Sequence, residues 1–474
     1  MVRDIAEGDA SSDPQLLTPV GDLLYFSADD GRGRNLWRTD GTFDGTVFVP
    51  AFGSFTSNIQ AITSFRDRAY FIANEFLCLV GEFGVSILLE NSAFGQYGLG
   101  TELVGLGDQA LLFSATARPN LGVEPFTIDV TGEGTKLLKD IRSLGGSSFP
   151  LGFYEWQGHL YFSARSVAGS DGVLWRTDGT EAGTELVSLT VVRDNPPMAN
   201  TSDKLVVLAE GGLYFSDGTS AGTINVPLPA GLVFGFDSRQ PGRFVGAGDN
   251  VYFYPRSADG FEVWTSDGTA EGARQLRDIA PGGANSNARD FTSFGGKMYF
   301  VADSPLDGTE LWVTDGTTQG TISLTDFSTT AVNVPIAELF VDEGEVHFVV
   351  GGSALWRTDG TVQGTRKEAD LGFIRAGVGT DDFFAVGSTL LFIQRDSTSG
   401  DLWKSDGTPA GTSILFPDIE DIANTKDVYA WNGATYFAAR TDAAGMELWK
   451  TDGTADGTVP VRDIFLGARK EAGS

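Results

Sequence analysis

Carboxylate side chains gather in two of the segments rich in Gly, Ser and Asp that separate the hydrophobic stretches of this chain. The segment "ADDGRGRN" places Asp29 beside Asp30, and "ADSPLDGTE" contains Asp303, Asp307 and Glu310. Calcium prefers carboxylate oxygens as ligands, so these five side chains are the candidate metal ligands of the sequence. The alternative, which we favour, is that they are solvated loop residues and that the protein has no cofactor.

Aspartate also begins a triplet, Asp-Gly-Thr, that recurs along the chain. These aspartates lack the D-x-D-x-D-G spacing that concentrates calcium ligands in one loop. We interpret each as a turn residue whose carboxylate accepts a hydrogen bond from the backbone N–H two residues on, while the glycine adopts a positive φ. The aspartates of this structural turn motif are Asp40, Asp178, Asp217, Asp267, Asp315, Asp359, Asp406 and Asp452.

A tryptophan lies three residues before most of these aspartates. If exposed, the indoles could stack on sugar rings, as in a lectin; if buried, they would fill the space between neighbouring structural units. We favour the buried role, because the tryptophans occupy the same position in each copy. These structural aromatic residues are Trp37, Trp175, Trp264, Trp312, Trp356, Trp403 and Trp449.

Catalysis finds little support in the residues. The only histidines, His159 and His347, fall in strand-like stretches of different copies, and Cys78 is the single cysteine. A Ser–His–acid or Cys–His arrangement needs a histidine beside a nucleophile, and nothing in the sequence places one there. Two histidines are also too few for a multi-histidine metal centre. We name no catalytic residue, although a glycosidase needs only a carboxylate pair and stays an alternative.

The triplets mark an internal repeat that must position all of these side chains. Two weaker copies fill the longest gap: "EPFTIDVTGEGT" has Asp129 at the marker position, and "EFLCLVGEFG" has Val80 there. The mean spacing of the ten markers is about 46 residues, which lies within the range for blades of a β-propeller. The markers lie near residues 40, 80, 129, 178, 217, 267, 315, 359, 406 and 452.

Each repeat contains four short stretches rich in aromatic and β-branched residues and bounded by Gly, Asp or Ser, as strands are. In the first repeat they run near 16–20, 23–28, 36–39 and 47–50. Four antiparallel strands in a repeat of this length are typical of one propeller blade. The sequence therefore predicts an all-β fold, a β-propeller of about ten four-stranded blades over residues 1–474.

The sequence does not determine whether the blades form one ring or two. We favour one ring, and two five-bladed rings divided near 188–203 or 228–240 are the alternative. The tetrapeptide "VRDI" occurs at 2–5 and again at 461–464, which predicts that one terminal segment completes the blade at the other end. Because Met1 directly precedes this repeat tail, we expect the chain to be a mature or excised fragment.

The units "ELWVTDGTTQGT" (310–321) and "ELWKTDGTADGT" (447–458) resemble the ELWxxDGT repeat family of secreted, often very long bacterial proteins, which are similar to β-propellers. Eight clear copies and two weaker ones carry this resemblance over nearly the whole chain. The resemblance implies a secreted or cell-surface location. It implies no common activity.

Charge narrows the classes of partner. The net charge of −30 repels nucleic acid phosphates and anionic membranes, so we expect neither nucleic acid binding nor membrane insertion. The hairpin loops before the tryptophan strands vary from copy to copy and should emerge on one face of the propeller.

We therefore expect a monomeric ring that acts as a non-catalytic extracellular binding or scaffold module of a larger bacterial surface or secreted protein. Its ligand would be a polysaccharide or a protein bound on that face of the propeller. The alternatives are a multivalent carbohydrate-binding lectin and a carbohydrate-active enzyme that uses a carboxylate pair.

Overall fold

The computed structural model describes residues 11–464 with internal gaps, and the described part consists of strands and their connections. The residues outside the description within this span are 32, 51–58, 74–75, 82–83, 90–101, 119–120, 130, 133, 144, 168–170, 193–194, 210–211, 234–243, 270–272, 328–333, 343, 353, 371–382, 387–388, 396–399, 407, 409, 420, 424–427, 442–444 and 463.

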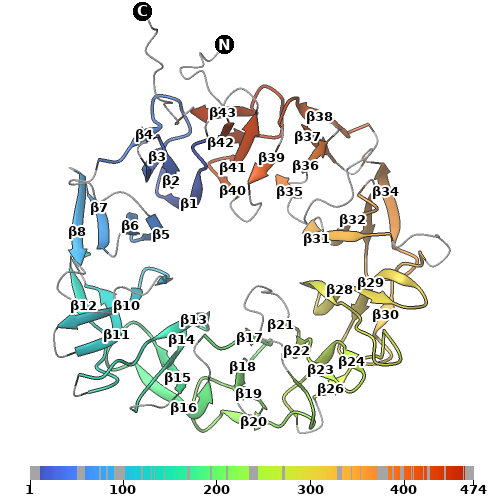
Figure 1. The fold of residues 1–474 in the computed structure, drawn as a ribbon, viewed down its shortest axis with the longest axis horizontal. Helices are drawn as coiled ribbons and strands as arrows, with labels where there is room; N and C mark the ends of the chain where they lie inside the picture. Colours follow the sequence, from blue (N-terminus) through green and yellow to red (C-terminus); the bar gives the residue numbers. More distant parts are fainter. Residues whose placement is uncertain are drawn as a thin grey trace, which may run out of the picture.

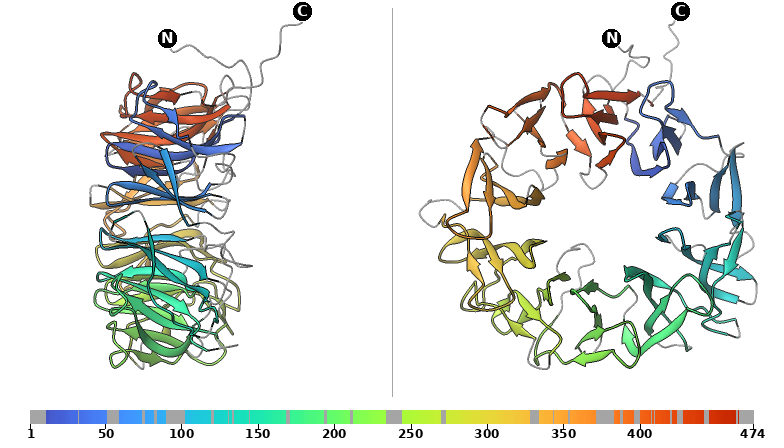
Figure 2. Two further views of the ribbon diagram at one scale, coloured as in Figure 1. Left: turned by 90° about the vertical axis from the view of Figure 1, so that its left-hand side faces the viewer. Right: turned by 180° about the vertical axis from the view of Figure 1, so that it is seen from behind.

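Ten antiparallel sheets follow one another along the chain and stand around a common centre as the blades of a single β-propeller (Figure 1). The side view shows a flat ring in which all blades lie at one level (Figure 2). The predicted all-β fold and the single ring are confirmed, and two separate five-bladed rings are excluded. In each blade the first strand lies nearest the centre and the fourth lies at the rim (Figure 1).

The first five blades each contain four strands in sequence order. They are β1–β4 (Gln15–Val20, Leu23–Asp29, Arg34–Thr39, Val47–Phe48), β5–β8 (Ile59–Phe65, Arg68–Ala73, Phe76–Gly81, Gly84–Leu89), β9–β12 (Leu103–Leu106, Ala110–Arg118, Leu121–Ile128, Thr135–Leu137), β13–β16 (Leu151–Trp156, His159–Ala164, Gly172–Thr177, Glu185–Val192) and β17–β20 (Met198–Asn200, Leu205–Ala209, Gly212–Ser216, Ile224–Val226).

The last five blades add two small variations. Blade 6 carries an extra hairpin, β23–β24, and in blade 10 both β39 and β40 pair with β41. Their strands are β21–β26 (Phe244–Ala247, Asn250–Phe253, Arg256–Ser257, Gly260–Phe261, Trp264–Ser266, Arg274–Gln275), β27–β30 (Arg289–Phe294, Lys297–Ser304, Gly308–Thr314, Ile322–Ser323), β31–β34 (Ile336–Asp342, Glu345–Val350, Ala354–Thr358, Arg366–Asp370), β35–β38 (Phe383–Val386, Thr389–Arg395, Gly400–Ser405, Ser413–Phe416) and β39–β43 (Asp421–Ala423, Tyr429–Trp431, Ala434–Thr441, Gly445–Thr451, Val459–Arg462).

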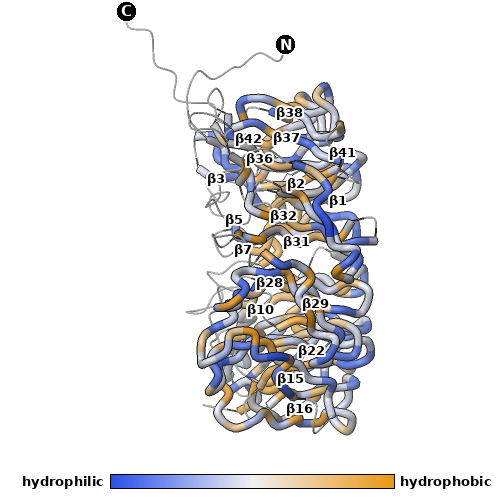
Figure 3. The backbone as a smooth tube through the Cα atoms, turned by 90° about the vertical axis from the view of Figure 1, so that its right-hand side faces the viewer, coloured by the Kyte–Doolittle hydropathy of each residue, from blue (hydrophilic) through white to orange (hydrophobic). Residues whose placement is uncertain are grey.

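The hydrophobic core lies between blades. A separate cluster of buried apolar side chains spans each pair of neighbouring blades, because each face of a blade packs against one of its two neighbours. Phe26 and Trp37 of blade 1, for example, pack with Tyr436 and Leu448 of blade 10. Hydrophobic stretches of the chain run along the blade strands, as at β10 and β31 (Figure 3). Burial of apolar surface stabilises the ring by about 25 cal/mol per Å².

The closure that the duplicated "VRDI" predicts stays a prediction, because the structure describes the two end blades but not residues 1–10. The strands of blade 1 all come from residues 15–48, and those of blade 10 all come from residues 421–462. The N-terminal copy at 2–5 lies outside the described residues. Among the described residues, the two end blades meet through side chains and hydrogen bonds, with no blade shared between the two ends.

Strand register corrects the repeat boundary in blade 2. Phe71 pairs with Cys78, just as Phe26 pairs with Trp37 in blade 1. Cys78 therefore occupies the tryptophan position, and Gly81 rather than Val80 occupies the position of the motif aspartate. The error arose because Glu75 resembles the first residue of the motif and shifts the alignment by one position.

The alternation of strands gives the ring two different ends. The turns between first and second strands and between third and fourth strands share one end, which we call the motif face because the Asp-Gly-Thr turns lie there. The loops between second and third strands and the connections from blade to blade share the other end, which we call the loop face. Antiparallel pairing in every blade places these turns and loops consistently.

Candidate functional site

The motif turn is a closed hydrogen-bond network. In blade 1, Asp40 Oδ1 accepts bonds from the Thr42 backbone N (2.9 Å) and hydroxyl (2.6 Å), and the Thr42 hydroxyl accepts one from Gly45 N (2.9 Å). The hydroxyls of Thr39 and Thr46 join 2.7 Å apart. The same aspartate, threonine and glycine contacts recur at Asp178, Asp217, Asp315, Asp359, Asp406 and Asp452.

Two glycines are required by this geometry. Gly41 has φ 86°, where a side chain is strained. A Cβ on Gly45 would overlap the Asp40 carboxylate, so the second glycine of "DGTxxGT" makes room for the motif aspartate itself. Asp267 accepts the same pair of bonds from Thr269, and Asp129 does so from Thr131.

These hydrogen bonds favour the ionised aspartates. The Thr42 hydroxyl holds the pKa of Asp40 below its usual value, and the Thr361 hydroxyl does the same to the pKa of Asp359. The motif aspartates are thus anionic at neutral pH, and one of their two oxygens is engaged by their own turn. This arrangement stabilises the turn and uses the carboxylate as a structural acceptor.

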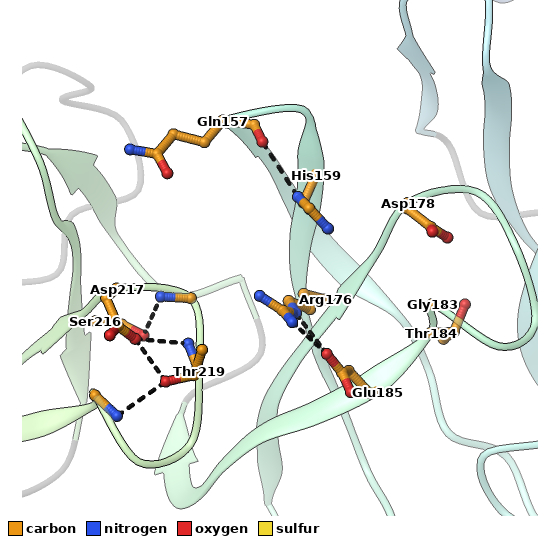
Figure 4. A network of polar contacts seen from close by, with 12 residues as sticks. Gln157, His159, Arg176, Asp178, Gly183, Thr184, Glu185, Ser216, Asp217 and Thr219 are labelled. Atoms are coloured by element: carbon orange, nitrogen blue, oxygen red, sulfur yellow. Dashed lines mark hydrogen bonds and ion pairs between the residues drawn. The ribbon is translucent and has the colours of Figure 1, made fainter.

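The motif turn also docks on the preceding blade. Tyr70 of blade 2 donates its hydroxyl proton to Gly132 O of blade 3 at 2.8 Å. Lys404 of blade 9 donates to Gly453 O of blade 10 at 3.1 Å. At the junction of blades 4 and 5, Arg176 pairs with Glu185 beside the turn of Asp217 (Figure 4). The repeated motif therefore joins blades as well as strands.

The motif tryptophans lie in the ring wall. Trp37, Trp175, Trp264, Trp312 and Trp449 are each no more than 8% exposed. Trp356 and Trp403 are half-buried and stand beside Phe348 and Phe392. Indoles in these positions contact neighbouring side chains and cannot serve as open platforms for sugar stacking.

The predicted acidic loop of blade 1 forms local hydrogen bonds. Asp29 Oδ1 accepts bonds from Gly31 N (2.8 Å) and Gly33 N (3.1 Å). Asn35 Nδ2 donates to Asp30 Oδ1 at 3.4 Å. Asp29 thus shapes the loop that carries it.

The acids of the blade 7 loop are engaged in a similar way. Asp303 Oδ1 accepts a bond from the Thr309 hydroxyl at 2.8 Å and lies 3.3 Å from Arg289. The Ser304 hydroxyl donates to Asp307 Oδ2 at 3.2 Å. Both carboxylates have partners within their own hairpin.

Glu310 differs from the loop residue that the sequence suggested. It lies within β29, is 1% exposed, and accepts bonds from the Thr325 hydroxyl and from Phe327 N (2.6 Å). Burial raises the pKa of its carboxyl group. Among the residues that the structure describes, no group of three or more His, Cys, Asp or Glu side chains is arranged to hold a metal ion.

The two histidines stand in different blades. His159 begins β14 in blade 4, where its Nδ1 lies 3.2 Å from Gln157 O (Figure 4). His347 lies in β32 of blade 8, stacked on Phe340 and 3.3 Å from the Glu368 carboxylate. The ring therefore does not bring the histidines together.

Sequence reasoning missed a set of buried glutamates. The glutamate that begins "ELW" points into the junction with the next blade, where it binds backbone N–H groups and hydroxyls. A signal was present in the sequence, because Ser12, Ser148 and Ser286 each follow the isoleucine of a "DI" tail at the same distance. These junction glutamates are Glu124, Glu262, Glu310 and Glu447.

The fold class follows from the blades themselves, and comparisons with known proteins add only distant structural likenesses. The chain belongs to the β-propellers by its ten blades, and no protein-family model and no curated protein matches it. Solved structures that resemble it include a puromycin hydrolase (15% identity, TM-score 0.32, covering 68% of this chain and 54% of that one). The designed Ika8 protein is 12% identical with a TM-score of 0.34 and covers 94% and 99% of the two chains.

A third such structure is PorZ, a surface component of the type-IX secretion system of Porphyromonas gingivalis, at 13% identity and a TM-score of 0.29 over 95% and 74% of the two chains. The chain spans about half the length of the puromycin hydrolases and the tricorn protease that it matches. These likenesses concern the fold alone. Within the described residues no helix has the length and apolar character needed to cross a membrane.

Proposed function

We propose that the chain is a non-catalytic binding or scaffold module of a larger bacterial surface or secreted protein. The resemblance of its units to the ELWxxDGT repeats supports the extracellular location. We further propose that a polysaccharide or a protein binds on the loop face and that the ring acts as a monomer.

The observation that carries this proposal is the contrast between the two faces. Seven blades present the same internally bonded turn on the motif face, in which one oxygen of the motif aspartate is already engaged by the turn itself. The loop-face segments differ in sequence and length: in blade 6 the second and third strands are joined by residues 254–263, which include the extra hairpin β23–β24, whereas in blade 7 they are joined by residues 305–307 alone. Variable loops on a rigid scaffold are where proteins usually place recognition.

The alternatives fit the geometry less well. A lectin that uses the motif tryptophans requires open indoles, and these indoles lie in the ring wall. An enzyme that uses a carboxylate pair requires two acids free to act on a substrate, whereas Asp29, Asp303 and Asp307 are hydrogen-bonded within their loops. We therefore retain the binding or scaffold role.

A binding experiment tests the proposal with two matched variants. The purified chain is assayed against bacterial polysaccharides and candidate surface proteins, with and without calcium. Leu306, 81% exposed on the loop face, is replaced by Ser, and Val362, 57% exposed on the motif face, is replaced by Ser as the control. We expect Leu306→Ser to weaken binding and Val362→Ser to leave it unchanged.

The opposite pattern would assign recognition to the motif face. Turnover of any bound polysaccharide by the purified chain would contradict the non-catalytic role. Selective binding to proteins alone would point to scaffolding within a larger surface assembly.

A further inference from the structure

The four junction glutamates lie at the loop-face end of the third strand of blades 3, 6, 7 and 10. Each is at most 1% exposed, and each faces the segment that leads into the next blade. Buried carboxyl groups are costly unless donors satisfy them. Their partners therefore show what these glutamates do.

At the junction of blades 3 and 4, Glu124 binds both ends of the connecting segment. Its Oε2 accepts bonds from Ile141 N (3.0 Å) and the Ser148 hydroxyl (2.7 Å), and its Oε1 accepts one from Ser148 N (3.2 Å). Ser148 is held in turn by backbone bonds to Val123 of blade 3 and Arg165 of blade 4. The carboxyl group is thus the centre of a joint between two blades.

The junction of blades 6 and 7 repeats the arrangement. Glu262 Oε1 accepts a bond from Ala280 N at 2.9 Å. Ser286 N donates to Phe261 O (3.0 Å), and Asp303 N donates to Ser286 O (2.7 Å). Ser286 therefore spans the two blades as Ser148 does.

The ends of the chain meet in the same way at the junction of blades 10 and 1. Glu447 Oε2 accepts bonds from the Ser12 hydroxyl (2.6 Å) and Ile464 N (3.1 Å). Asp29 N donates to Ser12 O at 2.8 Å. A buried carboxyl group thus also holds the junction at which the ring closes.

Electrostatics at these joints disfavours the carboxylate form. The pKa of Glu124 is raised to about 7, chiefly by burial; Asp140 contributes to the rise, and the hydrogen bonds from Ser148 and the Ile141 amide oppose it. Burial raises the pKa of Glu262 to about 6, with Asp278 adding to the effect and the Ala280 amide opposing it.

The pKa of Glu310 is shifted in the same direction. Burial raises the pKa of its carboxyl group, and the charged neighbours Asp326 and Asp307 add to the rise. The hydrogen bonds from Thr325 and Phe327 act against it. At all three of these junctions the acidic neighbours therefore oppose ionisation of the buried glutamate.

We infer that Glu124, Glu262 and Glu310 make the cohesion of the ring depend on pH, so that the blades they join hold together most firmly in mildly acidic solution and loosen as these carboxyl groups ionise. The sign follows from proton binding. Between the unfolded value of 4.5 and the raised folded value, the folded ring keeps protons that the unfolded chain has lost. Stability therefore falls as pH rises through this window.

Thermal unfolding of the full chain between about pH 5 and pH 8 tests this inference. Glutamine at both positions, in the Glu124→Gln/Glu262→Gln variant, keeps an acceptor oxygen and removes the titration. We expect the midpoint of the wild-type protein to fall as pH rises, and that of the variant to fall less. His159 and His347 are present in both proteins, so they do not affect the comparison.

Hydrogen exchange of the wild-type protein provides a second measurement that needs no variant. After correction for the intrinsic pH dependence of exchange, the amides of Ile141, Ser148 and Ala280 should lose protection as pH rises. The Thr180 amide, which donates to Asp178 in a motif-face turn, should not. Equal pH slopes for wild type and variant, a wild-type midpoint that rises with pH, or unchanged protection at the junction amides would each overturn the inference.

Discussion

The Ser12 hydroxyl donates a hydrogen bond of 2.6 Å to the carboxyl group of Glu447, although 435 residues separate the two along the chain. The corresponding bond between Ser148 and Glu124 measures 2.7 Å and joins residues only 24 positions apart. The junction at which the ring closes is therefore built like an internal one. What it lacks is a covalent connection between its two blades.

This difference predicts unequal consequences for two equivalent substitutions. Ser12→Ala and Ser148→Ala each remove one buried donor, which costs about 1 kcal/mol in the free energy of unfolding. Blades 3 and 4 remain tethered at high effective concentration, whereas blades 10 and 1 do not. Hydrogen exchange should show that the Asp29 amide loses more protection in Ser12→Ala than the Arg165 amide loses in Ser148→Ala. Equal losses would show that closure needs no help from this bond.

A double-mutant cycle tests the motif turn of blade 7. Asp315→Ala removes two hydrogen bonds from Thr317 and should lower the free energy of unfolding by about 1–2 kcal/mol, whereas Gln319→Ala in the same exposed turn should be neutral. Gly320→Ala places a methyl group on the Asp315 carboxylate and should also destabilise the protein.

The losses of unfolding free energy should be less than additive when the two changes are combined, because Asp315→Ala removes the carboxylate with which the methyl group of Gly320→Ala would clash. Urea unfolding midpoints of the four proteins measure this coupling. Simple additivity would mean that the second glycine serves some purpose other than room for the carboxylate.

The motif aspartates predict a loss of stability in strong acid. Hydrogen bonds from the Thr317 and Thr361 hydroxyls lower the pKa values of Asp315 and Asp359 from 3.8. A depressed folded pKa contributes stability above the unfolded value, and this stability is lost as pH falls through the folded value. Melting midpoints should drop below about pH 4, and the drop should be smaller in Thr317→Val/Thr361→Val. An unchanged drop would assign acid unfolding to other carboxylates.

The single thiol should be inert in the folded ring. Cys78 is 5% exposed, and burial raises the pKa of its thiol to about 12, so the reactive thiolate is scarce at neutral pH. A maleimide or disulfide reagent should label the native protein only after denaturant is added. Ser64→Cys, an exposed position on the same blade, should be labelled at once. Rapid labelling of the wild-type chain would show that blade 2 opens readily.

Removal of divalent cations should leave the described ring unaffected. Asp29, Asp303 and Asp307 accept hydrogen bonds from their own loops, and Glu310 is buried in its strand. The melting midpoint should therefore be the same with and without a chelator. A fall of several degrees would reveal a bound cation through lost linkage stabilisation and would direct the search to loops outside the described residues.

The fold could be predicted because a repeat of similar length recurs along the entire chain. The Asp-Gly-Thr markers gave the blade length, and the local chemistry of Asp40, Gly41 and Thr42 gave the turn, since all of its partners lie within a few residues. Contacts between blades could not be predicted in this way. The bond from Tyr70 to Gly132 joins residues 62 positions apart and depends on how two blades pack.

Glu310 illustrates the same limit. It follows Asp307 and Gly308, so in sequence it looks like the last residue of an acidic loop. In the structure the strand already begins at Gly308, and the side chain turns into the junction with blade 8. Burial of a single charged residue between two blades has no signature in its immediate neighbours.

In the part of the chain that the structure describes, each blade is built from consecutive residues, and the closing junction uses the same kind of contact as an internal one. The structure of the ring therefore does not depend on which blade comes first along the chain. A gene that joined the present ends and began at another blade would encode the same ring. Likewise, duplication or loss of one repeat adds or removes a complete blade and leaves both neighbours with a matching surface, so rings of different circumference can evolve from a single repeat.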